Sequence, residues 1–187
     1  DFSSFDDDIT KRFPGVTALD GVNISLDRGE VLALVGENGA GKSTLMKVLS
    51  GAYRADEGEI SLFGKAVNYT SPLLMMRMGV AIIYQELLLA PHLTVAENIY
   101  LGRMPRTPIG TIDWVKARRD AAALIDRLVF DIDPTAPVET LSVANRQIVE
   151  IAKALSQNAK ILVLDEPSAV LGDAELEKLF AIIRKLA

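Results

Sequence analysis

Hydrophobic and polar positions along the chain predict two kinds of strand. Between Val22 and Leu26 apolar and polar residues alternate, which is typical of a strand with one buried face. Three other runs are almost continuously apolar, as expected of strands buried on both faces of a parallel sheet. They are Glu30–Val35, Val80–Gln85 and Ile161–Leu164. Buried parallel strands need helices to cover them, so the pattern predicts an α/β fold.

Helical periodicity dominates the middle and the end of the chain. Apolar residues recur at i, i+3, i+4 and i+7 over Ala121–Leu128 and again over Ile148–Leu155, which indicates the buried stripe of an amphipathic helix. The strand pattern is missing from residues 86–157, so this stretch is predicted to be a helical insert. A last helix is predicted over Leu176–Ile183.

Turn and cap residues predict the short elements between these regions. Glu59–Val67 is typical of a β-hairpin that turns at Gly64. Ser71 is a suitable helix N-cap, Pro72 suits the first helical position, and Gly79 suits the end of the same helix. A short helix is therefore predicted between the hairpin and the next buried strand.

Composition narrows the class of protein. The 187 residues suffice for one domain with a sizeable core, and 49% of them are hydrophobic against 24% charged, as in a soluble globular protein. No apolar run approaches the roughly 18 residues of a membrane span. With 20 basic and 25 acidic residues the net charge is −5, which disfavours nucleic acid as a partner. The absence of cysteine excludes a disulfide scaffold and fits the cytoplasm.

The first eight residues differ from the rest. DFSSFDDD is acidic and shows little alternation, so we expect it to make a poor strand, and residues 1–8 are interpreted as a remnant of expression. The domain itself is expected to start at Ile9.

The sequence GENGAGKST lies between the strand Glu30–Val35 and a helix predicted over Lys42–Ser50, which Gly51 can end. Glycines let the backbone approach phosphate closely, so that successive N–H groups and the helix N-terminus face the anion. In such a loop the lysine adds positive charge for the β- and γ-phosphates, the serine hydroxyl ligates Mg²⁺, and the threonine bonds the α-phosphate. The predicted contacts to ATP are Gly36, Asn38, Gly39, Ala40, Gly41, Lys42, Ser43 and Thr44.

ILVLDE supplies the second half of a nucleotide site. A carboxylate at the carboxyl end of a buried strand is where Asp165 can hold the Mg²⁺ shell. Glu166, directly after it, can polarise the attacking water, which indicates a hydrolase rather than a binding protein.

In this order the motifs resemble those of the ATP-binding subunits of ABC transporters. IIYQE is similar to the family's Q-loop, and LSVANRQIVEIAKAL to the signature helix, which begins LSGGQ in the family. The resemblance implies that Gln85 contacts Mg²⁺ and the attacking water. It also implies that Ser142 binds the γ-phosphate held by a second ATPase domain, so that two domains sandwich two nucleotides. Here Val143, Ala144 and Asn145 replace Gly-Gly-Gln, so the backbone can approach phosphate less closely.

Three further positions are interpreted through the same resemblance. Phe13 matches the aromatic residue that stacks on adenine. Gly172 stands where the family's D-loop has aspartate, which weakens the expected communication between two sites. His92 lies inside the helical insert and is interpreted as a surface or packing residue.

The family's switch histidine would follow the strand after Ile183, so the chain is expected to be a fragment that binds ATP and hydrolyses it poorly.

Within the family, the longer motifs resemble the sugar-import subgroup of ribose, xylose and galactose type, and specifically an N-terminal ATPase half. GENGAGKSTLMKVLSGAY, IIYQELLLAPHLTVAENIYLGR and DEPSAVL carry this likeness. It implies that ATP and Mg²⁺ are the cofactors. The implied partners are membrane permease subunits, a second ATPase half and, indirectly, a periplasmic sugar-binding protein. The implied place is the cytoplasmic face of the membrane, with peripheral attachment.

The expected architecture is a P-loop NTPase (RecA-like) core with a parallel sheet, an antiparallel β subdomain and a helical insert. Residues 9–85 and 158–187 are assigned to the core and 86–157 to the helical subdomain. A soluble ABC-type ATPase of translation or DNA repair would share the nucleotide motifs without a permease. The acidic charge and the short insert disfavour that alternative.

Overall fold

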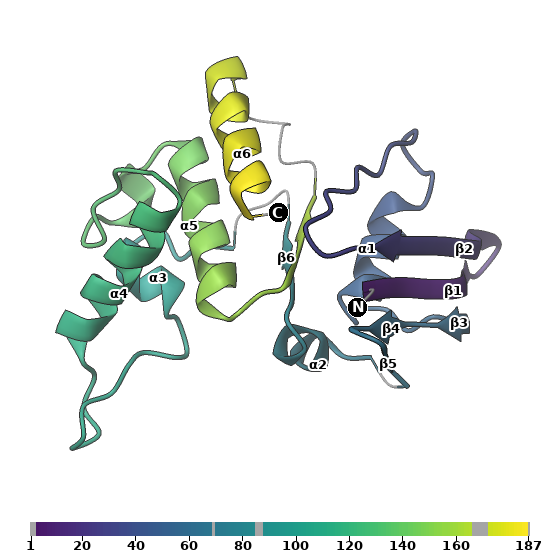
Figure 1. Ribbon diagram of the computed structural model, residues 1–187, viewed down its shortest axis with the longest axis horizontal. Coiled ribbons are helices and arrows are strands. Elements are labelled where there is room, and N and C mark those ends of the chain that lie inside the picture. The colour runs from purple at the N-terminus through teal and green to yellow at the C-terminus, as the bar shows by residue number, and fades with distance from the viewer. Residues whose placement is uncertain (1–2, 69, 85–87, 166–171, 187) are drawn as a thin grey trace. The chain divides into compact units, whose positions relative to one another are not determined.

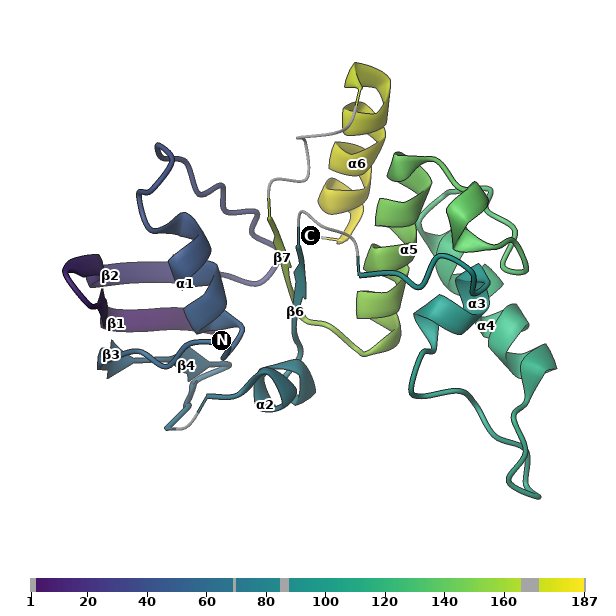
Figure 2. The same cartoon turned by 180° about the vertical axis from the view of Figure 1, so that it is seen from behind.

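The computed structural model describes residues 3–68, 70–84, 88–165 and 172–186 (Figure 1 and, from behind, Figure 2). The chain divides into two compact units. The first comprises Asp1–Ile82 together with Leu179–Ala187, and the second comprises Ile83–Lys178. Each unit is described by itself.

Antiparallel strands dominate the first unit. β1 (Ser3–Phe13) and β2 (Val16–Leu26) form a long hairpin, and β3 (Glu57–Glu59) pairs with the other edge of β1. Phe13 pairs with Val16 and Ser3 with Leu26, with register shifts between them. The alternating stretch expected as a strand is thus the second half of β2. These three strands are the expected antiparallel β region.

The expectation that the first eight residues make a poor strand is wrong. From Ser3 onward they belong to β1, where Ser4 pairs with Ser25 and Phe5 with Ile24. Strand pairing joins backbone N–H and C=O groups, so a neighbouring edge can order a segment whose side chains do not alternate. The side-chain amide oxygen of Asn23 also accepts the Asp8 N–H at 2.8 Å, next to the irregular register.

The apolar run Glu30–Val35, expected as a buried strand, is not a strand. Val31 is 58% exposed and Val35 is 93% exposed. A strand forms only where neighbouring strands accept and supply its backbone hydrogen bonds, and no strand in the described part of the chain pairs with this run. Residues 30–35 therefore have the apolar composition of a central strand, but no described strand forms hydrogen bonds with them.

Local signals placed the short elements of the first unit correctly. α1 (Lys42–Leu49) is followed by Gly51, which has a φ of 75°. β4 (Ser61–Leu62) and β5 (Lys65–Ala66) form the expected hairpin. Its turn residues Phe63 and Gly64 both have positive φ, as a type I′ turn requires. In α2 (Pro72–Arg77) the Ser71 hydroxyl accepts the Leu74 N–H at 3.3 Å.

Two short strands form the remaining sheet, β6 (Val80–Ile83) with β7 (Ile161–Leu164). At its end the Ile83 carbonyl accepts the Asp165 N–H at 2.9 Å. The chain closes with α6 (Asp173–Leu186), which buries Leu179 and Ile182. Phe180 on the same helix is 42% exposed.

Helices form most of the second unit, as predicted. α3 (Val95–Ile99), α4 (Trp114–Arg127) and α5 (Val143–Ser156) pack against one another, and a 3₁₀ turn covers Val138–Thr140. Ordinary capping chemistry starts each α-helix: Thr94 and Glu97 form a reciprocal capping box, Asp113 caps α4 and Ser142 caps α5. The fully buried core side chains come from all three helices, namely Val95, Ile99, Ala117, Ala121, Val149, Ile151 and Ala152.

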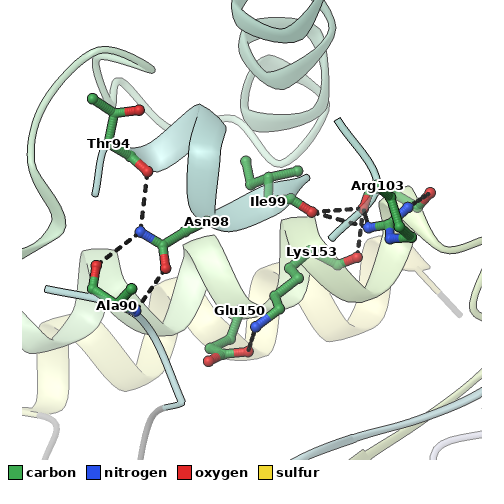
Figure 3. Close-up of polar contacts among 8 residues, drawn as sticks. Ala90, Thr94, Asn98, Ile99, Arg103, Glu150 and Lys153 are labelled. Carbon is green, nitrogen blue, oxygen red and sulfur yellow. Dashed lines mark hydrogen bonds and ion pairs between the residues drawn. The ribbon is translucent and has the colours of Figure 1, made fainter. Parts of the chain in front are cut away.

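A buried asparagine organises the segment that enters these helices. Asn98 has no exposed surface, and its amide nitrogen donates to the carbonyls of Ala90 and Thr94 at 3.0 Å each (Figure 3). It also donates to the Leu93 carbonyl at 3.2 Å. Its carbonyl oxygen accepts the Ala90 N–H at 2.7 Å. One side chain on α3 therefore satisfies the Ala90 N–H and adds a second hydrogen bond to three carbonyls that backbone N–H groups already reach.

Residues 134–139 bind the same segment from another side. Val138 N–H donates to Leu93 C=O at 3.0 Å, Glu139 N–H to Pro91 C=O at 2.9 Å, and Val95 N–H to Ala136 C=O at 3.0 Å. Backbone hydrogen bonds thus join residues 136–139, which precede α5, to residues 91–95.

Glu150 on α5 makes a third contact with this segment, at Leu88. Its side chain accepts the Leu88 N–H. The Lys153 ammonium lies 3.9 Å from Glu150 Oε2, and Figure 3 draws this ion pair. Glu150 is only 9% exposed, and its Oε1 has no hydrogen-bond partner among the described residues. Burial raises the pKa of this carboxyl, while Lys153 and the Leu88 N–H oppose the shift.

Replacing Asn98 with alanine is expected to destabilise the second unit by about 1–3 kcal/mol, because it leaves the part-buried Ala90 N–H without its acceptor and removes three further hydrogen bonds to backbone carbonyls. Urea unfolding followed by the fluorescence of Trp114, the single tryptophan, measures this, since Trp114 lies in that unit. Asn68→Ala at an exposed position controls for loss of an amide and should stay within about 0.5 kcal/mol of the wild type. Equal stability of Asn98→Ala would contradict the role assigned to the network.

Glu150→Gln is expected to remove one component of the pH dependence of stability. Because the pKa of Glu150 is raised above its ordinary 4.5, the folded state binds this proton more tightly than the unfolded state does. Wild-type stability therefore declines as the pH rises from the ordinary value through the folded-state pKa, whereas glutamine does not titrate. The unfolding free energy of the variant relative to the wild type should therefore increase as the pH rises above the ordinary carboxyl value of 4.5.

Glutamine retains an oxygen for the Leu88 N–H, so the comparison isolates the charge. Glu177→Gln, at an exposed position in the same unit, controls for loss of a carboxylate from the chain. A difference that stayed constant with pH would show that the Glu150 carboxyl is not held in an unfavourable environment for its charge.

Candidate nucleotide-binding site

The glycine-rich loop has the backbone geometry that its sequence predicts. Gly39 and Gly41 adopt φ of 87° and 89°, and Ala40 N–H donates to Glu37 C=O at 3.1 Å. A Cβ added to Gly41 would lie 2.5 Å from the carbonyl oxygen of Ala18 in β2. Both the left-handed backbone and this contact demand glycine, so β2 sets where the loop can turn into α1.

The N-terminus of α1 is open toward an anion. Gly41 occupies the N-cap position, where no side chain bonds the first helical N–H groups, and the first turn carries no acidic residue. Unsatisfied N–H groups and the positive end of the helix dipole favour a negatively charged ligand. The loop from Asn38 to Ala40 is exposed. A phosphate group therefore fits the chemistry of this position.

Lys42 supplies the cation at this position. Its ammonium donates to the carbonyls of Gly36 and Glu37 at 2.6 and 2.9 Å, so the side chain folds back over the loop. Both acceptors are neutral, which leaves the positive charge uncompensated by a carboxylate at these contacts. Ser43 is exposed and Thr44 half-buried in the first turn of the helix. The eight predicted ATP contacts thus lie together on one loop and the helix start.

Phe13 lies at the end of β1 in the same unit and takes part in an aromatic pair that the sequence did not reveal. Its ring meets Tyr53 edge-on, with centroids 5.5 Å apart. The Tyr53 N–H donates to Lys47 C=O at 2.9 Å, and the Lys47 ammonium lies 5.4 Å from the Tyr53 ring centroid. Phe13 is thereby linked through Tyr53 to the last turn of α1. An aromatic residue just after Gly51 was the available signal.

The second unit holds two of the predicted site residues within the described part of the chain. Asp165 follows β7 directly and is half-buried, with its N–H bonded to Ile83 C=O. Ser142 is exposed and accepts the Asn145 N–H at 3.2 Å, so its hydroxyl acts as the N-cap of α5. Gln85 and Glu166 lie outside the described residues, as do the D-loop positions 167–171.

The remaining singled-out residues have ordinary surroundings. His92 is exposed, and its Nδ1 lies 2.9 Å from a carboxylate oxygen of Glu139, as expected of a surface residue. The Gly172 carbonyl accepts the Leu176 N–H at the start of α6. Among the described residues no helix combines the length and apolar character needed to cross a membrane, and no three potential metal-binding side chains cluster together.

Comparison with known proteins bears directly on this site. The family described as "ABC transporter" matches residues 19–169. A ribose import ATP-binding protein of Rubrobacter xylanophilus is 55% identical over 95% of this chain and 36% of its own length. A putative ribose/galactose/methyl galactoside import ATP-binding protein of Burkholderia cenocepacia is 53% identical over 95% of this chain and 34% of its own length. The chain spans about a third of these curated relatives.

Solved structures resemble the fold along the whole chain. An ATP-binding cassette of an ABC transporter in its ADP conformation superposes with a TM-score of 0.87 at 28% identity, covering 100% of this chain and 77% of that one. The cbiO1 protein of Clostridium perfringens, part of an ABC transporter complex, gives 0.83 at 25% identity, covering 100% and 74%. The expected α/β P-loop architecture is confirmed. The matched residues include the phosphate loop, Ser142 and Asp165, and the chain belongs to the ABC transporter family.

Proposed function

We propose that this chain forms the nucleotide-binding part of an ATPase that powers sugar import through an ABC transporter. The observation that carries the proposal is the start of α1, where an uncapped helix N-terminus and the Lys42 ammonium lie on one exposed loop. The names of the most similar relatives support sugar import as the process. Nothing observed favours an ATPase of translation or DNA repair.

In the proposed site the loop binds the phosphates of ATP. Backbone N–H groups from Gly39 to Thr44 would face the anion, and Lys42 would exchange its two carbonyl acceptors for the β- and γ-phosphate oxygens. That exchange is inexpensive because it replaces two neutral acceptors with charged ones. Phe13 would stack on adenine, held by its edge-on contact with Tyr53.

The proposed hydrolysis needs a bound metal ion and an activated water. Ser43 and Asp165, with Gln85, are the oxygen ligands that would hold Mg²⁺, which offsets phosphate charge when bound. Glu166 would orient the attacking water and accept its proton, and Gln85 would position the same water. The residue types fit the group because carbonyl, hydroxyl and carboxylate oxygens are the ligands that Mg²⁺ prefers.

A second ATPase domain would complete each site. In this proposal Ser142 contacts the γ-phosphate bound by the opposite domain, and the N-terminus of α5 adds its dipole. In the structure the Ser142 hydroxyl already accepts the Asn145 N–H. Val143 is 42% exposed, so a side chain lies where the family's motif has glycine. We therefore propose weaker closure than an LSGGQ sequence allows, with Gly172 weakening communication between sites further.

The proposed partners follow from the same function. Membrane permease subunits would take up the motion of the helical residues 86–157, and a periplasmic sugar-binding protein would deliver the sugar without touching this chain. The protein would be attached peripherally to the cytoplasmic face of the membrane. Hydrolysis by the 187-residue chain alone is expected to be poor.

Lys42→Ala is expected to weaken MgATP binding at least about tenfold, because it removes the only side-chain cation of the loop. Isothermal titration calorimetry of the 187-residue chain measures this. Lys65→Ala, in the exposed hairpin strand β5, controls for loss of a lysine. Equal affinity of Lys42→Ala and wild type would sink the assignment of the phosphate site.

Glu166→Gln is expected to keep ATP binding and reduce turnover by about a hundredfold or more, since glutamine retains the size of the side chain but cannot accept the proton. The assay needs the assembled transport subunit and follows phosphate release, with binding measured in parallel. Undiminished turnover would show that another group activates the water.

A further inference from the structure

The connection between α3 and α4 folds into a small hairpin of its own. Arg106 and Ile112 form an antiparallel bridge, Thr107 N–H donates to Thr111 C=O at 2.8 Å, and Asp113 N–H donates to Pro105 C=O at 2.8 Å. In both views the hairpin extends away from the helices of its unit (Figure 1, Figure 2). Residues 105–113 together with the first turns of α4, through residue 119, are called the hairpin surface below.

The hairpin surface exposes large apolar side chains. Ile109 at the turn is 86% exposed, and Val115 in the first turn of α4 is 72% exposed. Trp114 and Ile112 add 46% and 38%. The buried side of α4 is formed instead by Ala117, Ala121 and Ile125. Apolar side chains gathered at a projecting tip indicate a binding surface.

Positive charge surrounds these apolar residues. Residues 103–120 contain Arg103, Arg106, Lys116, Arg118 and Arg119 against Asp113 and Asp120, a net charge of +3 in a chain of −5. The two acidic residues are engaged: Asp113 caps α4, and Asp120 accepts from Lys116 and Arg119. Arg106 and Arg118 donate to the carbonyls of Gly110 and Trp114, at 2.7 and 3.2 Å, which do not neutralise their charge.

We propose that the hairpin surface binds an anionic phospholipid surface. Arginines attract anionic headgroups, tryptophan favours the interface between water and acyl chains, and an exposed isoleucine at a turn can enter the headgroup layer. A second copy of the chain is disfavoured as the partner because two surfaces of charge +3 would repel. The proposal rests on the proposed function in that a transport ATPase works beside a bilayer.

The single tryptophan makes the test direct. Trp114 is part of the hairpin surface, so its fluorescence reports contact without a label. The 187-residue chain is mixed with vesicles of phosphatidylcholine alone and with vesicles containing phosphatidylglycerol, at low and at high salt. We expect a blue shift with the anionic vesicles only, quenching when they contain brominated acyl chains, and loss of binding as salt is added.

Two variants separate the charged and apolar contributions. Arg118→Gln with Arg119→Gln is expected to weaken vesicle binding about twentyfold, and Ile109→Ser about fivefold. Arg28→Gln with Lys65→Gln removes the same charge from exposed positions elsewhere. Val129→Ser removes a 75%-exposed apolar residue at the far end of α4, roughly 20 Å along the helix. Both controls should bind like the wild type.

The outcomes distinguish this proposal from the proposed function. The proposal is supported if all four variants retain MgATP binding and if vesicle binding is weakened only by Arg118→Gln with Arg119→Gln and by Ile109→Ser. No anionic-vesicle binding at low salt overturns it whether or not MgATP binds. So does vesicle binding without brominated-lipid quenching, because another face would then be responsible. A blue shift that depends on protein concentration without vesicles overturns it in favour of self-association.

Discussion

The close contact between Gly41 and β2 is the constraint on which the nucleotide site depends. The Ala18 carbonyl oxygen of β2 lies 2.5 Å from the place that a Cβ at position 41 would take, and the left-handed backbone there turns the chain into α1. Because the cap is glycine, the helix starts with donors that no side chain satisfies. Packing against the strand and openness to an anion are thus consequences of the same missing side chain.

The segment after Gln85 depends on a different interaction, the burial of polar side chains that bond backbone. Asn98 holds the turn from one helix and Glu150 reaches Leu88 from another, while residues 134–139 add main-chain bonds. These contacts join the chain following one proposed catalytic residue to the chain preceding Ser142. Displacement of either segment would therefore strain the main-chain hydrogen bonds that join it to the other segment.

Sequence predicted those elements whose signals are local. Ser71, Pro72 and Gly79 bounded α2 and Gly64 marked the hairpin, because each signal depends on a few adjacent residues. The nucleotide loop was predictable for the same reason. The strand expected over residues 30–35 failed because pairing needs neighbours distant in sequence, and residues 3–8 became a strand because such a neighbour was present. Asn98 was missed, although an asparagine beside Ile99 in an apolar helix was its signal.

Glu150 shows why a functional arrangement need not be the most stable one. Burial disfavours its charge, one oxygen lacks a partner among the described residues, and Lys153 compensates only from 3.9 Å. An apolar residue of similar size would remove the cost of burying the charge. It would also remove the acceptor for the Leu88 N–H. A more stable helical unit would therefore hold Leu88, three residues after Gln85, less firmly.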